Sequence, residues 1–207
     1  MLHHHYFDLY RKQVVKQADL VLALYLRGGE FSPEDKARNF EYYEALTVRD
    51  SSLSAFAQAV VAAEVGHLEL AYDYFGEAAL LDLGNLHHNT RDGVHMASLA
   101  GAWIAVVAGF GGMRDHGGSL SFAPRLPQQL SRLSFRLLFR GRRIRVEMDH
   151  EQARYFLLGG APLDVAHHGD NVTLTPGEPV TRPIPKPLSR EAPSQPPGRA
   201  PARRRPT

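Results

Sequence analysis

Residues 86–112 read LHHNTRDGVHMASLAGAWIAVVAGFGG, a polar loop followed by the most apolar helical pattern in the chain. Between Met96 and Val107, large apolar residues recur at steps of three and four, with small residues between them. Because no face of this helix carries a charge, the pattern predicts a buried helix. The free N–H groups of this helix and the positive end of its dipole point towards a group of polar side chains. These are Asn89, Thr90, Arg91, Asp92 and His95. We interpret the junction as an anion or sugar site at the mouth of a helical barrel.

The same loop also fits a purely structural role. Thr90 or Asp92 would then cap the helix, His95 would be a hydrogen-bonded interior residue, and the glycines after residue 108 would end the helix. Spacing alone favours this structural interpretation, because short motifs often match by chance.

Apolar stripes earlier in the chain predict four more helices, joined by short connections. These stripes lie at residues 14–25, 33–43, 56–61 and 68–79. Asp50, Ser51 and Ser52 come just before the third stripe, where that helix should begin. The two hydroxyls fit a phosphate or sugar contact and a helix cap equally well, so both interpretations stay open.

Beyond residue 112 the apolar period changes from 3.6 to 2, which is typical of β-strands. Strands are predicted at residues 133–139, 143–148, 154–158 and 171–175. The first two strands lie on either side of Gly141 and Arg142 and predict a β-hairpin with a basic outer face. The fold class is therefore α+β, with helices at 1–112 followed by a β domain at 113–178.

The remaining residues, 179–207, are rich in proline and arginine. Residues 176–207 hold ten of the 14 prolines, and seven Lys and Arg residues against two Glu. Such a segment buries little apolar surface, so we expect a disordered basic tail. Basic runs are usually solvated, and we therefore predict no nucleic-acid partner for the tail or for the arginines of the hairpin.

Composition narrows the class of protein further. The chain has 207 residues, no cysteine and no apolar run near the roughly 20 residues of a membrane span. Its start lacks the pattern of a secretory signal, so we expect a cytoplasmic protein without a membrane partner.

Common cofactor and metal motifs are missing from the sequence. It contains no Walker loop and no Gly-x-Gly-x-x-Gly after a strand, so no nucleotide cofactor is predicted. His87, His88, His95 and His116 lack the spacing of a metal site, and no metal is predicted. Asp50, Glu64 and Asp92 are carboxylates that glycoside chemistry could use, but nothing distinguishes them from helix caps.

Five ordered motifs resemble the carboxy-terminal part of glycoside hydrolase family 65, which contains phosphorylases of maltose, trehalose and kojibiose and some hydrolases. They are YFDLYRKQVVKQAD at 6–19, FEYYE at 40–44, TVRDSSLS at 47–54, AYDYF at 71–75 and DGVHMASLAG at 92–101. The resemblance covers about residues 5–175. It implies that the helices are the last ones of an (α/α)6 barrel, which carries the active site, and that a small antiparallel β-sandwich follows.

The resemblance also implies roles for individual residues. Lys16 and Gln17 match a pair that contacts the glucosyl unit at the bond to be cut. Ser51, Ser52 and His95 match the phosphate site of the phosphorylases. The expected substrates are an α-linked glucose disaccharide and inorganic phosphate, without a cofactor. Phosphate would attack the anomeric carbon with inversion while a glutamic acid protonates the leaving oxygen.

The chain departs from the family in one respect. The general-acid glutamate belongs to an earlier part of the barrel, so no catalytic residue is assigned here. We expect a carboxy-terminal portion of an inverting α-glucoside phosphorylase or hydrolase, inactive and poorly soluble alone. Its unpartnered helix faces, such as those of Val21 and Trp103, would need the missing part as a second chain, and an oligomer is also compatible. The alternative is a non-catalytic carbohydrate-binding or interaction module derived from such an enzyme.

Overall fold

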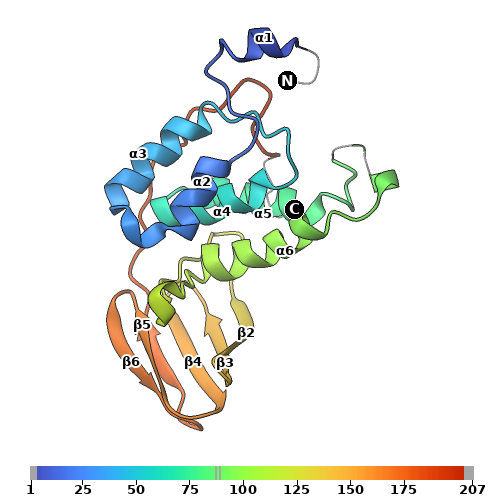
Figure 1. The fold of residues 1–207 in the computed structure, drawn as a ribbon. Coiled ribbons are helices and arrows are strands. Elements are labelled where there is room, and N and C mark those ends of the chain that lie inside the picture. The colour runs from blue at the N-terminus through green and yellow to red at the C-terminus, as the bar shows by residue number, and fades with distance from the viewer. Residues whose placement is uncertain (1–3, 87, 89, 203–207) are drawn as a thin grey trace. The chain divides into compact units, whose positions relative to one another are not determined.

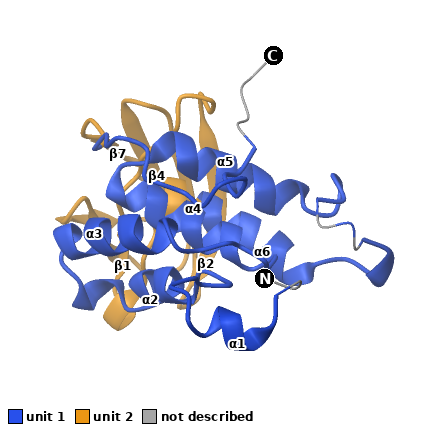
Figure 2. Ribbon diagram, turned by 90° about the horizontal axis from the view of Figure 1, so that it is seen from above, with its two compact units in different colours: residues 1–106, 188–207 blue, residues 107–187 orange. Residues whose placement is uncertain are grey.

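The computed structural model describes residues 4–86, 88 and 90–202. The chain forms two compact units (Figure 2). Unit 1 comprises residues 1–106 together with 188–207, and unit 2 comprises residues 107–187. Unit 1 is helical and unit 2 is built mainly of strands (Figure 1).

Unit 1 contains five helices of eight or more residues within its described part, as the apolar stripes predict. A short helix, α1 (Tyr6–Leu9), precedes them, and the long helices are α2 (Asp19–Leu26), α3 (Pro33–Glu44), α4 (Ser54–Val65), α5 (Leu68–Leu80) and α6 (Met96–Ile104). α2 starts later than the stripe at 14–25 predicts, because Val15 forms an extended bridge with Thr47. Lys16 and Gln17 therefore lie in the segment that leads into α2.

α4 is the central helix of unit 1, and α2, α3, α5 and α6 each pack against it. Ten of its twelve residues are buried, and most of these are alanine or valine. Small side chains allow the neighbouring helices to approach closely on several sides. The helix ends at Gly66, whose φ of 102° a residue with a Cβ would adopt only with strain.

The prediction of a buried helix at 96–107 is wrong for one side of α6. Met96, Leu99 and Trp103 form a stripe on α6 and are 72%, 43% and 52% exposed, whereas Ser98 and Gly101 face the unit's interior. An uncharged sequence shows that a helix can be buried but does not supply the neighbour that buries it. Val21, which we expected to be exposed, is fully buried on α2.

The (α/α)6 barrel itself is not confirmed, because such a barrel needs twelve helices. The residues that the structure describes supply the five long helices of unit 1. After α6 the chain continues through a π-helical turn at Ala105–Phe110 and a 3-10 turn at His116–Gly118.

Unit 2 consists of two small sheets. One has the order β2-β3-β4-β7 and is antiparallel, and the other has the order β1-β5-β6. The strands are β1 (Leu120–Phe122), β2 (Leu133–Phe139), β3 (Arg142–Met148), β4 (Gln152–Gly159), β5 (Leu163–His167), β6 (Asp170–Leu174) and β7 (Val180–Pro183). The predicted hairpin is confirmed as β2 and β3. Its turn residues are Arg140 and Gly141, both at positive φ, so the turn lies one residue earlier than predicted. The expectation of a purely antiparallel domain is wrong at one place, since β1 pairs with β5 in parallel.

The two sheets of unit 2 share a core that includes a buried polar bridge. Phe122 of β1 packs against Tyr155 of β4, with ring centroids 5.2 Å apart. The Tyr155 hydroxyl lies 2.6 Å from Nδ1 of His167 on β5, and Nε2 of His167 lies 2.9 Å from the carbonyl oxygen of Pro183 on β7. A neutral imidazole satisfies both contacts, because Nδ1 then accepts and Nε2 donates.

The expected disorder of the tail is not confirmed for the residues that the structure describes. Residues 180–183 form β7 along β4, and residues 188–202 return to unit 1. Backbone hydrogen bonds and a few side-chain contacts hold this segment in place. The amino-acid composition of the segment did not predict these contacts. Arg203, Arg204 and Arg205 lie outside the described residues, as do His87 and Asn89.

Unit 2 should lose stability as the pH falls below about 6.5. Burial lowers the pKa of His167 below the ordinary histidine value of about 6.5. The unfolded chain therefore takes up a proton before the folded one does, and stability falls as the pH decreases towards the folded pKa. The slope from this residue reaches about 1.4 kcal/mol per pH unit.

Melting temperatures between pH 7.5 and 4.5 measure this effect. His167→Gln, which keeps one donor and one acceptor, should flatten the profile relative to the unaltered chain. An identical acid slope in both proteins would contradict the assignment.

Candidate functional site

The starts of α4 and α6 lie at the same end of unit 1, because the two helices run in parallel (Figure 1). Gly101 on α6 lies so close to Phe56 on α4 that an added Cβ would come within 2.7 Å of the ring. One turn further along both helices, Ala105 joins the core cluster that contains Ala59. The structure therefore brings the two predicted anion-binding helix starts to one end of the unit.

At the start of α4, the two serines take different roles. Leu53 is the N-cap residue and makes no side-chain capping bond. Oγ of Ser51 accepts the Leu53 N–H at 3.3 Å, which is a weak local cap. Ser52 is half-buried, and within residues 4–86, 88 and 90–202 its hydroxyl makes no hydrogen bond. Ser52 is thus the better placed of the two hydroxyls to contact a ligand.

Lys16 and Gln17 lie beside this helix start. The Lys16 carbonyl accepts the Asp50 N–H at 3.0 Å, so the two segments are joined by backbone bonding. The Lys16 side chain is exposed, whereas the Gln17 amide donates to the Asp19 carboxylate at 3.0 Å. The structure therefore brings the predicted sugar contacts and the predicted phosphate contacts of α4 together.

At the start of α6, His95 occupies the N-cap position without a side-chain capping bond. Asp82, just after α5, holds it at two points. The Asp82 carboxylate accepts the His95 backbone N–H at 2.9 Å, and its other oxygen lies 2.5 Å from Nδ1 of the ring. The hydrogen bond from the His95 ring lowers the pKa of Asp82. An ionised Asp82 fixes the orientation of the imidazole through these two contacts.

Sequence reasoning missed Asp82, because a carboxylate 13 residues before a histidine gives no local signal. The capping alternative for Thr90 and Asp92 is wrong. Both residues belong to a separate 3-10 turn, Thr90–Asp92. The hydroxyl of Thr90 instead bonds the Asn85 side chain at 2.8 Å.

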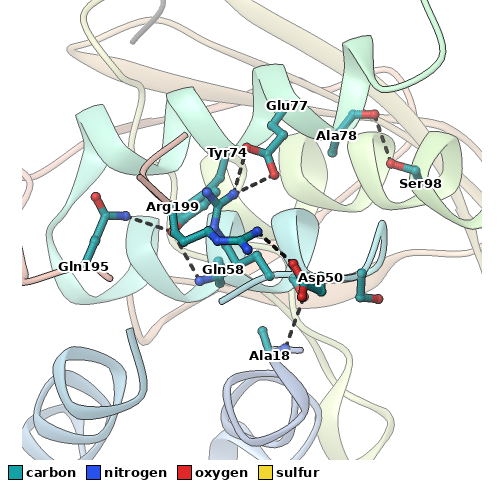
Figure 3. Close-up of polar contacts among 12 residues, drawn as sticks. Ala18, Asp50, Gln58, Tyr74, Glu77, Ala78, Ser98, Gln195 and Arg199 are labelled. Carbon is teal, nitrogen blue, oxygen red and sulfur yellow. Dashed lines mark hydrogen bonds and ion pairs between the residues drawn. The ribbon is translucent and has the colours of Figure 1, made fainter. Parts of the chain in front are cut away.

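A buried polar network lies between the helices of unit 1 (Figure 3). Glu44, at the end of α3, is 1% exposed and accepts hydrogen bonds from the Tyr74 hydroxyl, from Gln58 Nε2 at 2.7 Å and from Gln195 Nε2 at 2.7 Å. Tyr74 also accepts from Gln58 at 3.2 Å and from Gln195 at 2.9 Å. Helices α3, α4 and α5 and the tail are thereby joined through one carboxylate.

Burial raises the pKa of two groups in this network. Burial raises the pKa of Glu44, although the bonds from Tyr74, Gln195 and Gln58 oppose the shift. Burial also raises the pKa of Tyr74 well above its ordinary value. Arg49 extends the network, because its Nη1 bonds both oxygens of Glu77 at 2.6 and 2.7 Å and its guanidinium lies 5.0 Å from the centre of the Tyr74 ring.

Glu44 and Arg49 fall within two of the recognised motifs, 40–44 and 47–54, yet the sequence assigned neither of them a role. In the structure they stabilise the interior behind the start of α4. Among the described residues, no group of three His, Asp or Glu side chains is arranged to hold a metal ion. No helix in that part of the chain is long and apolar enough to cross a membrane.

Comparison with known proteins agrees with this arrangement. Residues 1–104 match the glycosyl hydrolase family 65 central catalytic domain, and residues 113–174 match the C-terminal domain of that family. The protein is therefore a member of the glycoside phosphorylase and hydrolase class. More particularly, the chain belongs to glycosyl hydrolase family 65.

Individual relatives support the assignment. An uncharacterized glycosyl hydrolase of Mycobacterium leprae is 56% identical over 99% of this chain and 26% of its own length. An alpha,alpha-trehalose phosphorylase of Thermoanaerobacter brockii is 40% identical over 86% of this chain and 23% of its own length. A solved structure named as a kojibiose phosphorylase from the human microbiome superposes with a TM-score of 0.80 at 29% identity, covering 87% of this chain and 24% of its own. The chain thus spans about a quarter of the length of the relatives it matches.

Glu44→Ala should destabilise unit 1 by about 2–4 kcal/mol. The substitution leaves the Tyr74 hydroxyl and two amide groups without their buried acceptor. Chemical denaturation followed by circular dichroism measures the loss. Glu34→Ala, an exposed glutamate on the same helix, is the matched control and should change stability by less than about 0.5 kcal/mol. Equal effects of the two substitutions would show that the network contributes nothing beyond helix propensity.

Proposed function

We propose that this chain supplies the glucosyl and phosphate contacts of an inverting α-glucoside phosphorylase or hydrolase. The observation that carries the proposal is the parallel arrangement of α4 and α6, with Ser51 and Ser52 at one helix start and His95 at the other. Two positive dipole ends at one end of the unit favour a phosphate dianion. The trehalose, maltose and kojibiose phosphorylases among the relatives add support.

In this proposal each residue has one task. Ser52, helped by Ser51, donates its hydroxyl hydrogen to phosphate, and His95, oriented by Asp82, contacts the phosphate through its ring. Lys16 and Gln17 hold the glucosyl unit beside the start of α4. Phosphate is then positioned to attack the anomeric carbon on the face opposite the leaving sugar. Water in its place would give hydrolysis.

The proton for the leaving oxygen comes from outside this chain in our proposal, since no residue here matches the family's general acid. The exposed apolar stripe of Met96, Leu99 and Trp103 on α6 is the surface that such a complementing part would cover. The alternative, a non-catalytic carbohydrate-binding module, keeps the sugar contacts but needs no such partner.

Phosphate binding should depend on Ser52. Ser52→Ala removes a hydroxyl that makes no bond within the described part of the chain, so affinity for inorganic phosphate should fall about tenfold with little change in melting temperature. Isothermal titration calorimetry with phosphate measures the effect. Ser134→Ala, an exposed serine on β2, is the control. Unchanged phosphate affinity in Ser52→Ala would remove Ser52 from the site.

The purified chain should release no glucose 1-phosphate from trehalose, maltose or kojibiose in the presence of phosphate. Adding the part of a related phosphorylase that precedes the matched region should restore turnover and should shield Trp103 from quenchers of its fluorescence. Because the chain has one tryptophan, the fluorescence reports on α6 alone. Turnover by the chain by itself would contradict the proposal, and shielding without turnover would favour the binding module.

A further inference from the structure

The segment 188–202, here called the strap, runs along α4 from its last residue to its start. Leu188 packs against Gly66, where α4 ends, and the Arg190 N–H donates to the Gly66 carbonyl at 3.1 Å. At the other end, Nη1 of Arg199 bonds the Asp50 carboxylate at 2.7 Å, immediately before Ser51 and Ser52 (Figure 3). The strap therefore carries an arginine to the helix start at which we place phosphate.

The strap is fixed between these two ends by a buried anchor. Gln195 inserts its amide between Glu44 and Tyr74, as described above. A turn follows, in which the Arg199 N–H donates to the Pro196 carbonyl at 3.0 Å and Gly198 has a φ of 71°. Proline followed by glycine at these positions is typical of a type II turn. The turn ends at Arg199 and therefore fixes the backbone position from which the Arg199 side chain extends.

Charge explains why an arginine is useful at this point. The Asp50 side chain is 14% exposed, so its negative charge is only weakly screened, and it lies next in sequence to Ser51. A carboxylate there would repel an incoming phosphate, since like charges a few ångström apart interact strongly away from bulk water. The Arg199 guanidinium, 41% exposed, is one of the positive groups that compensate that charge.

We propose that Arg199 is a positioning residue of the phosphate site, which acts by neutralising Asp50 and holding it away from the bound anion. The inference rests on the proposed function, because it needs phosphate at the start of α4. The inference adds that phosphate binding requires the strap, a segment that lies outside all of the recognised motifs. The strap thereby couples the carboxy-terminal end of the chain to anion binding.

A double-mutant cycle on the full chain tests this inference by calorimetric titration with inorganic phosphate. Arg199→Ala should weaken phosphate binding roughly fivefold to tenfold, because the Asp50 charge loses part of its compensation. Asp50→Asn combined with Arg199→Ala should recover affinity to within about twofold of the unaltered chain, since both charges are then removed. Arg199→Lys should retain most of the binding. A general loss of structure would instead weaken the binding of maltose as well.

Arg190→Ala is the matched control, because it removes one arginine from the same strap at the far end of α4. It should leave phosphate affinity unchanged, and titration with maltose should be unchanged in every variant. Tighter phosphate binding by Arg199→Ala would show that the strap obstructs the site and would overturn the proposal. Failure of the double variant to recover would overturn it as well.

The same titrations distinguish this inference from the proposed function. If the unaltered chain binds maltose but no phosphate, the phosphate assignment and the role of Arg199 fail together. If the unaltered chain binds phosphate and Arg199→Ala binds it equally well, the site stands and the role of Arg199 alone is refuted.

Discussion

The enclosure of α4 is the constraint on which the rest of unit 1 depends. Four helices pack against it, and ten of its twelve residues are inaccessible to water. Such a helix can carry only small or apolar side chains, or polar ones whose hydrogen bonds are met inside the protein. Gln58 is its one large polar residue in this buried set, and the surrounding helices supply two acceptors for its amide nitrogen.

The buried network around Glu44 follows from that requirement. Gln58 bonds Glu44 and Tyr74, and Gln195 of the strap completes the set. Gln58 joins α4 to α3 and α5, and Gln195 joins the strap to α3 and α5, so the network specifies how these segments are arranged while contributing modestly to net stability. The position of the α4 start, and with it Ser51 and Ser52, is a consequence of this packing.

In our proposal, anion binding at the α4 start uses backbone groups whose direction the helix already determines. Parallel packing of α6 adds a second helix start, and Asp82 fixes the histidine that occupies it. Neither helix start needs an acid or a metal to attract phosphate. This division of tasks agrees with our proposal that phosphate or water attacks the sugar while another part of the protein protonates the leaving group.

The sequence by itself determined the elements with a clear period. The five long helices and the β2–β3 hairpin were predictable, since local apolar spacing and turn residues specify them. The ordered motifs identified the family. Tertiary structure decided what depends on residues far apart in the chain: the exposure of Trp103, the parallel β1–β5 pair, the hold of Asp82 on His95 and the return of the strap to Asp50. The physical reason is that burial and charge compensation are properties of neighbours in space, which local periodicity does not encode.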